Sequence, residues 1–505
     1  MSPRLRPATR RTALVTERCA QGLGRGAGWV VSRILPILMA WCLMGACGRG
    51  ATYRKPDLRI PGSWDSDGAT VGAGIRTDEA GDLSAWWRRL NDPVLSGLIQ
   101  EALGSNMDLL KSVARLREAR ERRVMAEAAR KPTVSGSGSA GTRLSSNLEG
   151  RTENTNSLAA GLDASWELDV FGGVSGAIDA AVADVEVVEA ETHGVRVSLA
   201  AEVGLAYVEF RSVRLRLAIF EKSTALQEET LQLLRLRNDS GLDNAQELEQ
   251  AISQLEQTRA QLPVLQLSAS EAVYRLDLLL GLSPGSTRAR LAGEADLPRI
   301  PATIAIGIPA EVLRRRPDIR AAERKLVAET AREGVARAQL YPSFKLSGSF
   351  GVEMLLGNGT SAFLSLLGGI TVPLFDGGRL RAQLRLQTAV CDQALLAYRQ
   401  VILTALREVQ GAVSTLTRQR ERKETLTRAL EAARRADELA RQRFTAGVID
   451  FQPVLDTGRS LLTLEDSLAT TRAAEVNALI QLYKALGGGW SPASSSGQAG
   501  EGHKP

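Results

Sequence analysis

Histidine is almost missing from this chain of 505 residues, which contains only His193 and His503. Aromatic side chains are also few, at 4% of the residues, whereas a large compact enzyme core usually contains more rings. No glycine-rich phosphate loop follows a predicted strand. The sequence therefore offers no histidine-based catalytic or metal site, and we expect neither an enzyme nor a bound metal or cofactor.

Cysteine and long runs of like charge are scarce as well. The four cysteines are Cys19, Cys42, Cys47 and Cys391, and the first two precede the cleavage site predicted below. The remaining two form no disulfide framework and no metal-ligand cluster. The net charge of +6 is spread among mixed signs, without a run of five like charges. This pattern argues against a nucleic-acid-binding arm, and we expect no nucleic acid partner.

The N-terminal apolar stretch, Ile34–Met44, is too short to span a bilayer and has the length of a signal-peptide core. Arg33 precedes it, and two small residues then precede Cys47. This arrangement resembles the lipobox of bacterial lipoproteins, in which the cysteine becomes the first residue and carries lipid. A signal peptide cut elsewhere is the alternative. We predict a signal peptide over residues 1–46, lipid on Cys47, and a translation start near Val30.

The remainder of the chain contains a tandem duplication. Several landmarks recur in the same order at an offset of about 205 residues. A unit of this length is far longer than a solenoid repeat, so each copy is expected to be a large structural unit. The clearest landmarks are a proline that ends a helical pattern, a Gly-Gly pair and a turn glycine: Pro132 and Pro342, Gly172 and Gly377, Gly241 and Gly447.

These patterns divide the chain into six predicted segments. The signal peptide comes first, and a lipidated extension follows it. Two repeats separated by a linker make up most of the chain, and a disordered tail ends it. The predicted bounds are 1–46 for the signal peptide, 47–85 for the extension, 86–281 for the first repeat, 282–308 for the linker, 309–490 for the second repeat and 491–505 for the tail.

Each repeat is predicted to contain one very long helix between two shorter ones. Val174–Ser240 and Arg379–Thr445 each run for about 67 residues without proline, enough for roughly 100 Å of helix. Apolar residues recur in them every seven positions, which is typical of coiled coils. The shorter helices, such as Ser105–Lys131 and Leu242–Gly281, together nearly match the long one. We therefore expect them to stack end to end beside it.

Two predicted strand pairs interrupt the helices. Apolar residues alternate with small or polar ones in Leu158–Leu168, Phe344–Val352 and Leu366–Leu374. Such alternation is typical of barrel strands with one face in lipid and one in water, although a soluble sandwich strand also alternates. Four strands cannot enclose a water-filled lumen, and an open sheet edge is not tolerated in lipid.

The predicted fold is therefore mainly α with a small β part. An antiparallel coiled-coil helical barrel is expected to continue into a transmembrane β-barrel, in which three chains contribute four strands each to make twelve. A soluble coiled-coil scaffold with a small sandwich is the alternative architecture.

Four motifs carry a resemblance to the outer membrane factor family, the TolC-like efflux ducts, and within it to the lipidated NodT/OprM type. The resemblance covers roughly Trp86 to Trp490. The motifs are "IPAEVLRRRPDIRAAE" (Ile308–Glu323), "LYPSF" (Leu340–Phe344), "VPLFDGG" (Val372–Gly378) and "LYKALGGGW" (Leu482–Trp490).

The resemblance implies a homotrimeric channel in the outer membrane of a Gram-negative bacterium, anchored by lipid and extending into the periplasm. An inner-membrane pump of the RND or ABC type and a periplasmic membrane fusion adaptor would be its partners, together with outer membrane lipid. The implied function is export of small molecules or drugs by a tripartite efflux system. The outer membrane duct of a type I protein secretion system is the alternative.

The resemblance also implies a periplasmic gate. The turns at Gly241 and Gly447 would be the periplasmic tips, and Asp456, nine residues after the second glycine, would face the pore. Three such carboxylates on a narrow axis would attract cations. Gln452 is the next gate candidate, and a solvated helix carboxylate is the plainer interpretation of Asp456.

Further site residues follow from the same resemblance. Arg237 and Arg443 precede the two turns equivalently and could form salt bridges between neighbouring tips. Pro317 and Asp318 are expected to start a helix, where proline needs no amide partner and the aspartate faces the positive helix end. The segment Arg314–Arg316 is interpreted as a solvated turn, and contact with phospholipid or a neighbour is the alternative. The junction between barrel and tunnel is expected at two glycine pairs, Gly172 with Gly173 and Gly377 with Gly378.

Overall fold

The computed structural model describes residues 53–56, 64, 75–76, 81–146, 152–239, 244–293, 296–356 and 359–491. Cys47 and Gly241 lie outside these ranges. The chain divides into two compact units, which are described separately. The sheet unit is built chiefly from Val124–Ala180 and Glu329–Cys391, and the helical unit from Lys55–Arg123, Ala181–Ala328 and the chain from Asp392 onward.

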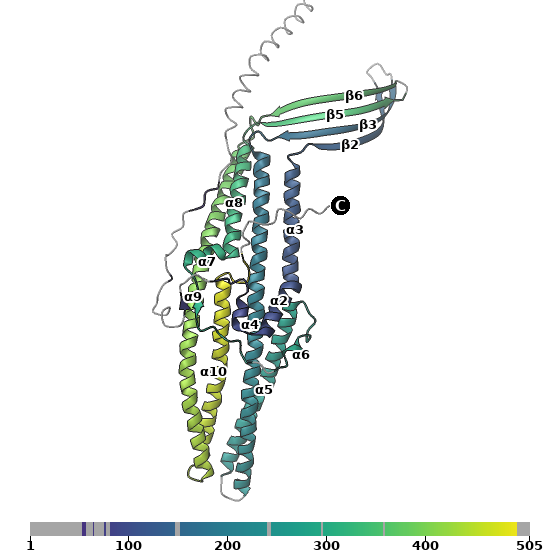
Figure 1. Cartoon of the computed structure of the whole chain (residues 1–505). Coiled ribbons are helices and arrows are strands. Elements are labelled where there is room, and N and C mark those ends of the chain that lie inside the picture. The colour runs from purple at the N-terminus through teal and green to yellow at the C-terminus, as the bar shows by residue number, and fades with distance from the viewer. Residues whose placement is uncertain are drawn as a thin grey trace, which may run out of the picture. The chain divides into compact units, whose positions relative to one another are not determined.

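The sheet unit contains one antiparallel sheet of four strands, as the sequence predicts. The strands are β2 (Thr133–Ser146), β3 (Thr152–Leu168), β5 (Ser343–Leu355) and β6 (Gly359–Thr371). Their order is β2-β3-β5-β6, so the hairpins of the two repeats lie next to each other (Figure 1). The central strands β3 and β5 join the two repeats.

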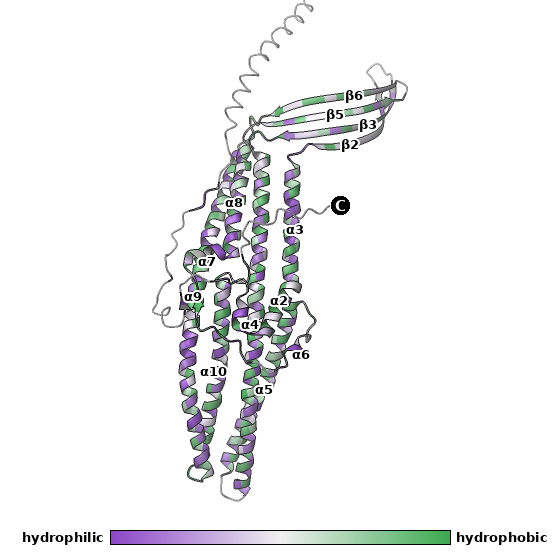
Figure 2. Ribbon diagram, in the orientation of Figure 1, coloured by the Kyte–Doolittle hydropathy of each residue, from purple (hydrophilic) through white to green (hydrophobic). Residues whose placement is uncertain are grey.

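The register separates a polar face of the sheet from an apolar one. Asp163 of β3 is opposite Ser135 and Ser349, whereas its neighbour Leu162 is opposite Gly136 and Phe350. Hydrophobic and hydrophilic residues accordingly alternate along the strands in Figure 2. Successive side chains of a strand point to opposite faces, so the predicted period of two is confirmed.

The helices of the two repeats have matching lengths. The long helices α4 and α9 contain 67 residues each, α3 and α8 contain 22 each, and α5 and α10 contain 36 and 34. Among the helices of the described ranges, none is both long and apolar enough to span a membrane. The bounds are α3 Met107–Ala128, α4 Gly173–Asp239, α5 Ala245–Leu280, α8 Pro317–Ala338, α9 Arg379–Thr445 and α10 Gln452–Ala485.

Short elements of the helical unit lie in the predicted extension, in the linker and at the starts of both repeats. They include a parallel pairing of two residues per strand between β1 and β4. Their bounds are β1 Ile75–Arg76, η1 Trp86–Leu90, α2 Pro93–Ser105, α6 Arg288–Leu291, β4 Ile304–Ala305 and α7 Pro309–Arg315.

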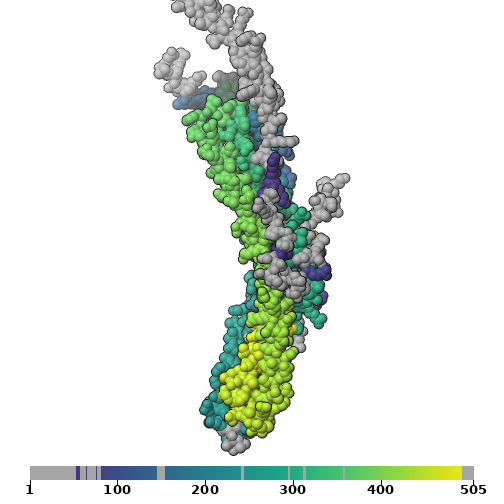
Figure 3. Space-filling model, turned by 90° about the vertical axis from the view of Figure 1, so that its left-hand side faces the viewer, coloured from purple at the N-terminus to yellow at the C-terminus, as the bar shows by residue number. Residues whose placement is uncertain are grey.

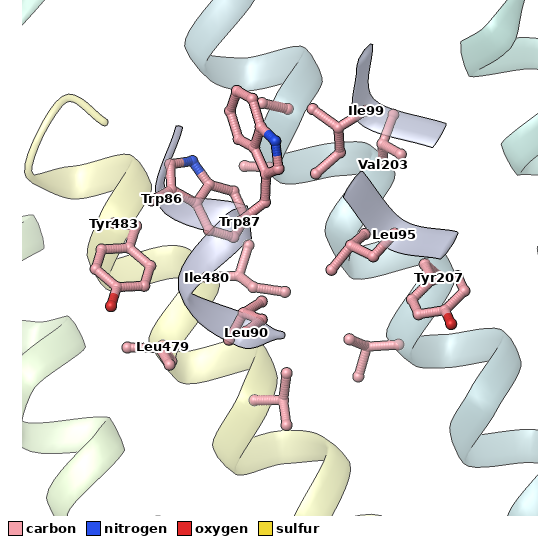
Figure 4. Packing of buried hydrophobic residues seen from close by; sticks show 14 of the residues in the cluster. Trp86, Trp87, Leu90, Leu95, Ile99, Val203, Tyr207, Leu479, Ile480 and Tyr483 are labelled. Atoms are coloured by element: carbon pink, nitrogen blue, oxygen red, sulfur yellow. The ribbon is translucent and has the colours of Figure 1, made fainter. Parts of the chain in front are cut away.

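The largest apolar core of the helical unit forms where η1 and α2 pack against α4 and α10 (Figure 4). Trp86 is fully buried, and its ring stacks on Tyr483 with 5.4 Å between centroids. Gly204 permits this close packing, since a Cβ there would lie 3.2 Å from Ile480 and 3.3 Å from Trp86. Each fully buried large side chain contributes about 1.5–3 kcal/mol, so this core fixes the N-terminal segment on the long helices.

A second core of the helical unit joins the lower ends of the two long hairpins. It contains Leu234 of α4, Leu255 of α5, Phe444 of α9 and Leu455 of α10, all buried. Figure 3 shows α9 and α10 side by side in this region. The predicted coiled-coil packing of the long helices therefore holds both hairpins of one chain together.

Candidate functional site

The turn of the second hairpin is built around Gly447. Its φ of 71° is left-handed, a conformation that favours glycine because it has no Cβ. The amide of Gly447 donates to Phe444 O at 2.9 Å, and that of Val448 donates to Arg443 O at 2.9 Å. These bonds cap the carbonyl end of α9, so the predicted tight turn is present at Gly447.

The two predicted gate residues contact each other directly after this turn. Nε2 of Gln452 donates to both carboxylate oxygens of Asp456, at 3.2 and 3.4 Å. Both side chains are exposed, whereas Val454 and Leu455 between them are buried in the second core. Asp456 therefore lies on the unpacked face of α10, one turn after its first residue, Gln452.

The two predicted tip arginines have different surroundings within the chain. The guanidinium of Arg237 lies 4.7 Å from the centroid of the Phe444 ring, so it links α4 to α9 by a cation–π contact. Such a contact contributes about 0.5–1 kcal/mol at exposed sites. Arg443 is exposed. Salt bridges from these two residues to neighbouring copies stay a prediction.

The two strand-to-helix junctions of the sheet unit need glycine at three of the four predicted positions. Gly172, Gly377 and Gly378 have φ values of 77°, 67° and 88°, in the left-handed region. Gly173 instead begins α4 as its first helical residue. The chain thus leaves each strand through a backbone conformation that other residues rarely adopt.

An aspartate that the sequence reasoning missed caps the long helix at each junction. Asp169 accepts hydrogen bonds from the amides of Val174 and Ser175 at 3.0 and 2.7 Å. Burial acts to raise the pKa of Asp169, but the bonds from Ser175 and Val174 outweigh it and lower that pKa. Asp376 accepts from the amides of Gly378 and Leu380 at 2.9 and 2.8 Å, and these bonds lower its pKa.

In the first repeat, a side chain joins the end of α5 to the start of α3. Nδ2 of Asn106 donates to Leu279 O at 2.8 Å, and its Oδ1 accepts from the amide of Leu109 at 3.0 Å. The hydroxyl of Ser105 donates to Leu280 O at 2.6 Å. Since α3 begins where α5 ends, the predicted end-to-end stacking is present, and we call this contact the first helix joint.

In the second repeat, Arg316 makes the equivalent contact between α10 and α8. Its Nη1 donates to Ala485 O at 2.9 Å, and Nη2 pairs with Asp318 and Glu408 at 2.7 Å each. Burial acts to lower the pKa of Arg316, but Asp318 and Glu408 raise it overall. We call this contact the second helix joint; it also ties α8 and α10 to α9.

The second joint corrects one prediction. The interpretation of Arg314–Arg316 as a solvated turn is wrong, because Arg314 and Arg315 belong to the last turn of α7 and Arg316 is only 7% exposed. Three acceptors from three helices surround its guanidinium, and this compensates for the loss of water. Pro317 is the first residue of α8, and Asp318 accepts from the amide of Ile319 at 2.9 Å, in keeping with their predicted place at a helix start.

The described ranges contain no cluster of three His, Cys, Asp or Glu side chains that could hold a metal ion. His193 stacks on Trp490 with 4.5 Å between ring centroids, and burial lowers its pKa. The Cys391 sulfur lies 3.5 Å from the hydroxyl of Thr330. These side chains are therefore engaged in packing.

Comparison with known proteins identifies the family. The model of the family "Outer membrane efflux protein" matches residues 98–282 and 308–488. The outer membrane protein OprJ of Pseudomonas aeruginosa is 32% identical over 460 residues, covering 90% of this chain and 95% of OprJ. The pyoverdine export outer membrane protein OpmQ of the same organism is 32% identical over 470 residues, covering 90% of this chain and 97% of OpmQ.

Solved structures agree with the sequence comparison. The outer-membrane channel OprN superposes with a TM-score of 0.82 at 35% identity, covering 88% of this chain and 100% of that structure. The predicted resemblance is thereby confirmed, and the family members are channels. This chain belongs to the outer membrane efflux protein family and acts as an outer membrane channel for export.

Proposed function

We propose that three copies of this chain form one continuous exit duct, which receives small molecules from a periplasmic adaptor and an inner-membrane pump of the RND or ABC type. The sheet is the observation that carries this proposal. Among the residues that the structure describes, no further strand of the same chain lies beside its outer strands, β2 and β6. In lipid such edges must be paired, so β6 of one copy would pair with β2 of the next until a ring closes.

Twelve strands lie within the range known for transmembrane barrels and give a wider interior than eight strands, whose interior side chains fill. The apolar face of the sheet would contact lipid and the polar face would line the lumen. A head-to-tail contact of this kind closes a ring when the rotation between copies is one third of a turn. The lipid on Cys47 would add a second anchor to the same membrane.

The gate of this duct is proposed at the second turn. Asp456 is exposed on α10 and accepts hydrogen bonds from Gln452, so neither side chain is committed to the packed core. Three copies would place three carboxylates around one axis, where they would attract cations. Arg237 and Arg443 would tie neighbouring tips by exposed salt bridges of up to about 1 kcal/mol each, weak enough to part when the gate opens.

The names of several relatives point to different cargoes. OpmQ of Pseudomonas aeruginosa is named for pyoverdine export, TtgI of Pseudomonas putida for toluene efflux, and CusC of Escherichia coli for cation efflux. The identities lie between 28% and 32%, so one architecture accompanies unrelated cargoes. We infer that the pump selects the cargo and that this chain supplies the passage without a chemical step.

Native mass measurement of the full-length protein in detergent tests the assembly, and planar-bilayer recording tests the channel. The expected results are a trimer and a small resting conductance, because the gate is closed at rest. A stable monomer in a membrane-like environment would overturn the proposed architecture. A large constitutive current would show that the tips do not close.

A further inference from the structure

One aromatic ring lies on the face of the sheet that is mainly polar or small, a face that also carries Leu355 and Leu367. Phe363 of β6 pairs with Gly351 of β5, and its neighbours on that face of β6 are Ser361 and Ser365. Leu364, the next residue, points to the opposite, apolar face. Among the described residues of the four strands, Phe363 is the only aromatic side chain on the polar face.

The Phe363 ring lies over Gly351, the residue directly opposite. A Cβ built on Gly351 would lie 2.5 Å from Cζ and 2.7 Å from Cε1 of Phe363. Gly351 is buried beneath the ring, whereas Phe363 itself is still 50% exposed. The glycine therefore makes room for the ring close to the backbone, and in the single chain, where β6 is an edge strand, a large part of the ring stays open to solvent.

Covering a glycine with a cross-strand aromatic stabilises a sheet, and this role alone could explain the ring. A stable sheet does not require glycine at position 351, however. The φ of Gly351 is not in the left-handed region, so alanine fits the same backbone. An alanine at position 351 with a serine at position 363 would fill the same space without leaving half of a phenylalanine exposed on a mainly polar face.

We propose that Phe363 is an aromatic contact site in the wall of the duct, which retains solutes that carry planar aromatic groups on their way out. This inference rests on the proposed function, in which the polar face of the sheet lines the lumen. Three copies would then present three Phe363 rings at one level of the barrel. Aromatic groups bind such rings by offset stacking or edge-to-face contacts.

Single-channel recording in planar bilayers tests this site with two cations of equal charge. Tetraphenylphosphonium carries aromatic rings and tetrabutylammonium does not. The measured quantity is the residence time of each cation in the channel, which does not depend on the resistance of the rest of the duct. Phe363→Ala should shorten the residence time of tetraphenylphosphonium about two- to ten-fold, the range expected for an aromatic pair, and change that of tetrabutylammonium less.

Two further variants separate binding from folding. Gly351→Ala combined with Phe363→Ser fills the space beneath the ring while removing the ring, so it should shorten the residence time as Phe363→Ala does. Leu364→Ala removes an adjacent side chain that is 83% exposed on the apolar face, and it should leave both residence times unchanged.

Unchanged residence times in the double variant, or an equal effect of Leu364→Ala, would overturn the inference while leaving the channel itself in place. Absence of any conducting channel in the wild type would overturn the proposed function, and the inference with it.

Discussion

Replacing Arg316 by alanine should loosen the end of α10 far more than replacing an exposed arginine elsewhere in the helical unit. Arg316 donates one hydrogen bond to Ala485 O and pairs with Asp318 and Glu408. Its own side chain is 8% exposed, but those of Asp318 and Glu408 are 46% and 40% exposed. The bond to the carbonyl is therefore the larger loss, and the two ion pairs are partly screened by solvent.

The magnitude follows from these contacts. A hydrogen bond from a charged donor contributes about 1.5–3 kcal/mol, and a partly exposed ion pair contributes at most about 1 kcal/mol. The local opening free energy at the α10 end should therefore fall by about 3 kcal/mol. Since 1.4 kcal/mol corresponds to a factor of ten, amide hydrogen exchange there should accelerate roughly 100-fold.

Hydrogen exchange followed by mass spectrometry on the detergent-solubilised protein measures this effect. The informative amides are those of Leu486 and Gly488, which donate to Leu482 O and Tyr483 O at the end of α10. The control is Arg122→Ala, since Arg122 pairs with Glu118 on the same helix at 74% and 57% exposure. Its loss should cost about 0.3–0.5 kcal/mol and leave exchange at the α10 end unchanged.

An acceleration of less than ten-fold in Arg316→Ala would refute this reasoning. It would mean that apolar packing of Tyr483 and Leu486 holds the second joint without the arginine. Equal acceleration in Arg122→Ala would refute it too, because the effect would then be general destabilisation. Asn106→Ala provides an intermediate case, since its neutral bond to Leu279 O should give a smaller acceleration at the end of α5.

Three further predictions concern other parts of the chain. Mass spectrometry of the mature N-terminus should show lipid on Cys47, and an unmodified terminus at another residue would exclude it. Cys47→Ser should lower the efficiency of assembly without abolishing membrane insertion, because the barrel is itself an anchor. Asp456→Ala should raise single-channel conductance and weaken block by multivalent cations while leaving the trimer intact, whereas unchanged conductance would place the constriction elsewhere. Gly281→Ala should destabilise the first joint by about 2 kcal/mol or more in the same exchange experiment, because φ is 73° and the new Cβ would lie 2.8 Å from Ser105 O. Gly411→Ala, in open space on α9, should instead stabilise its helix by about 0.5–1 kcal/mol. If Gly411→Ala were more destabilising than Gly281→Ala, the close approach of α5 and α3 at the first helix joint would be contradicted.

Local patterns were sufficient to predict the long helices, the shorter helices beside them and the four strands of the sheet, but not the short elements such as η1, α2 and α7. The 67-residue lengths of α4 and α9 follow from the absence of proline over Val174–Ser240 and Arg379–Thr445. The faces of the sheet follow from strict alternation in β3 and β5. The caps Asp169 and Asp376 carried a usable local signal, an aspartate four or three residues before a long helix, which the glycine pairs beside them obscured.

Contacts between distant residues could not be predicted from local patterns. Asn106 and Leu279 are 173 residues apart, and Arg316 and Ala485 are 169 residues apart. Neither contact can be predicted until the ends of the helices are known to within one residue. Sequence patterns are least informative about helix ends. A segment of three arginines also suggests a solvated surface. The burial of Arg316 could therefore be recognised only from the three-dimensional positions of its acceptors.

The first and second helix joints have one physical reason, the carbonyls at the end of a buried helix, which recur in both repeats. A helix that ends in the protein interior leaves its last carbonyls without partners, and a second helix stacked on it cannot supply amide donors beyond its own first turn. Residues directly before the second helix lie close enough to donate to those carbonyls, and in the first repeat Ser105 does so as well as Asn106. Asn106 and Arg316 both hold that position, before Met107 and Pro317, yet one is neutral and short and the other is charged and long. Geometry thus fixes the place of the donor in both repeats, while its chemistry differs because only Arg316 also has acidic partners, Asp318 and Glu408, within reach.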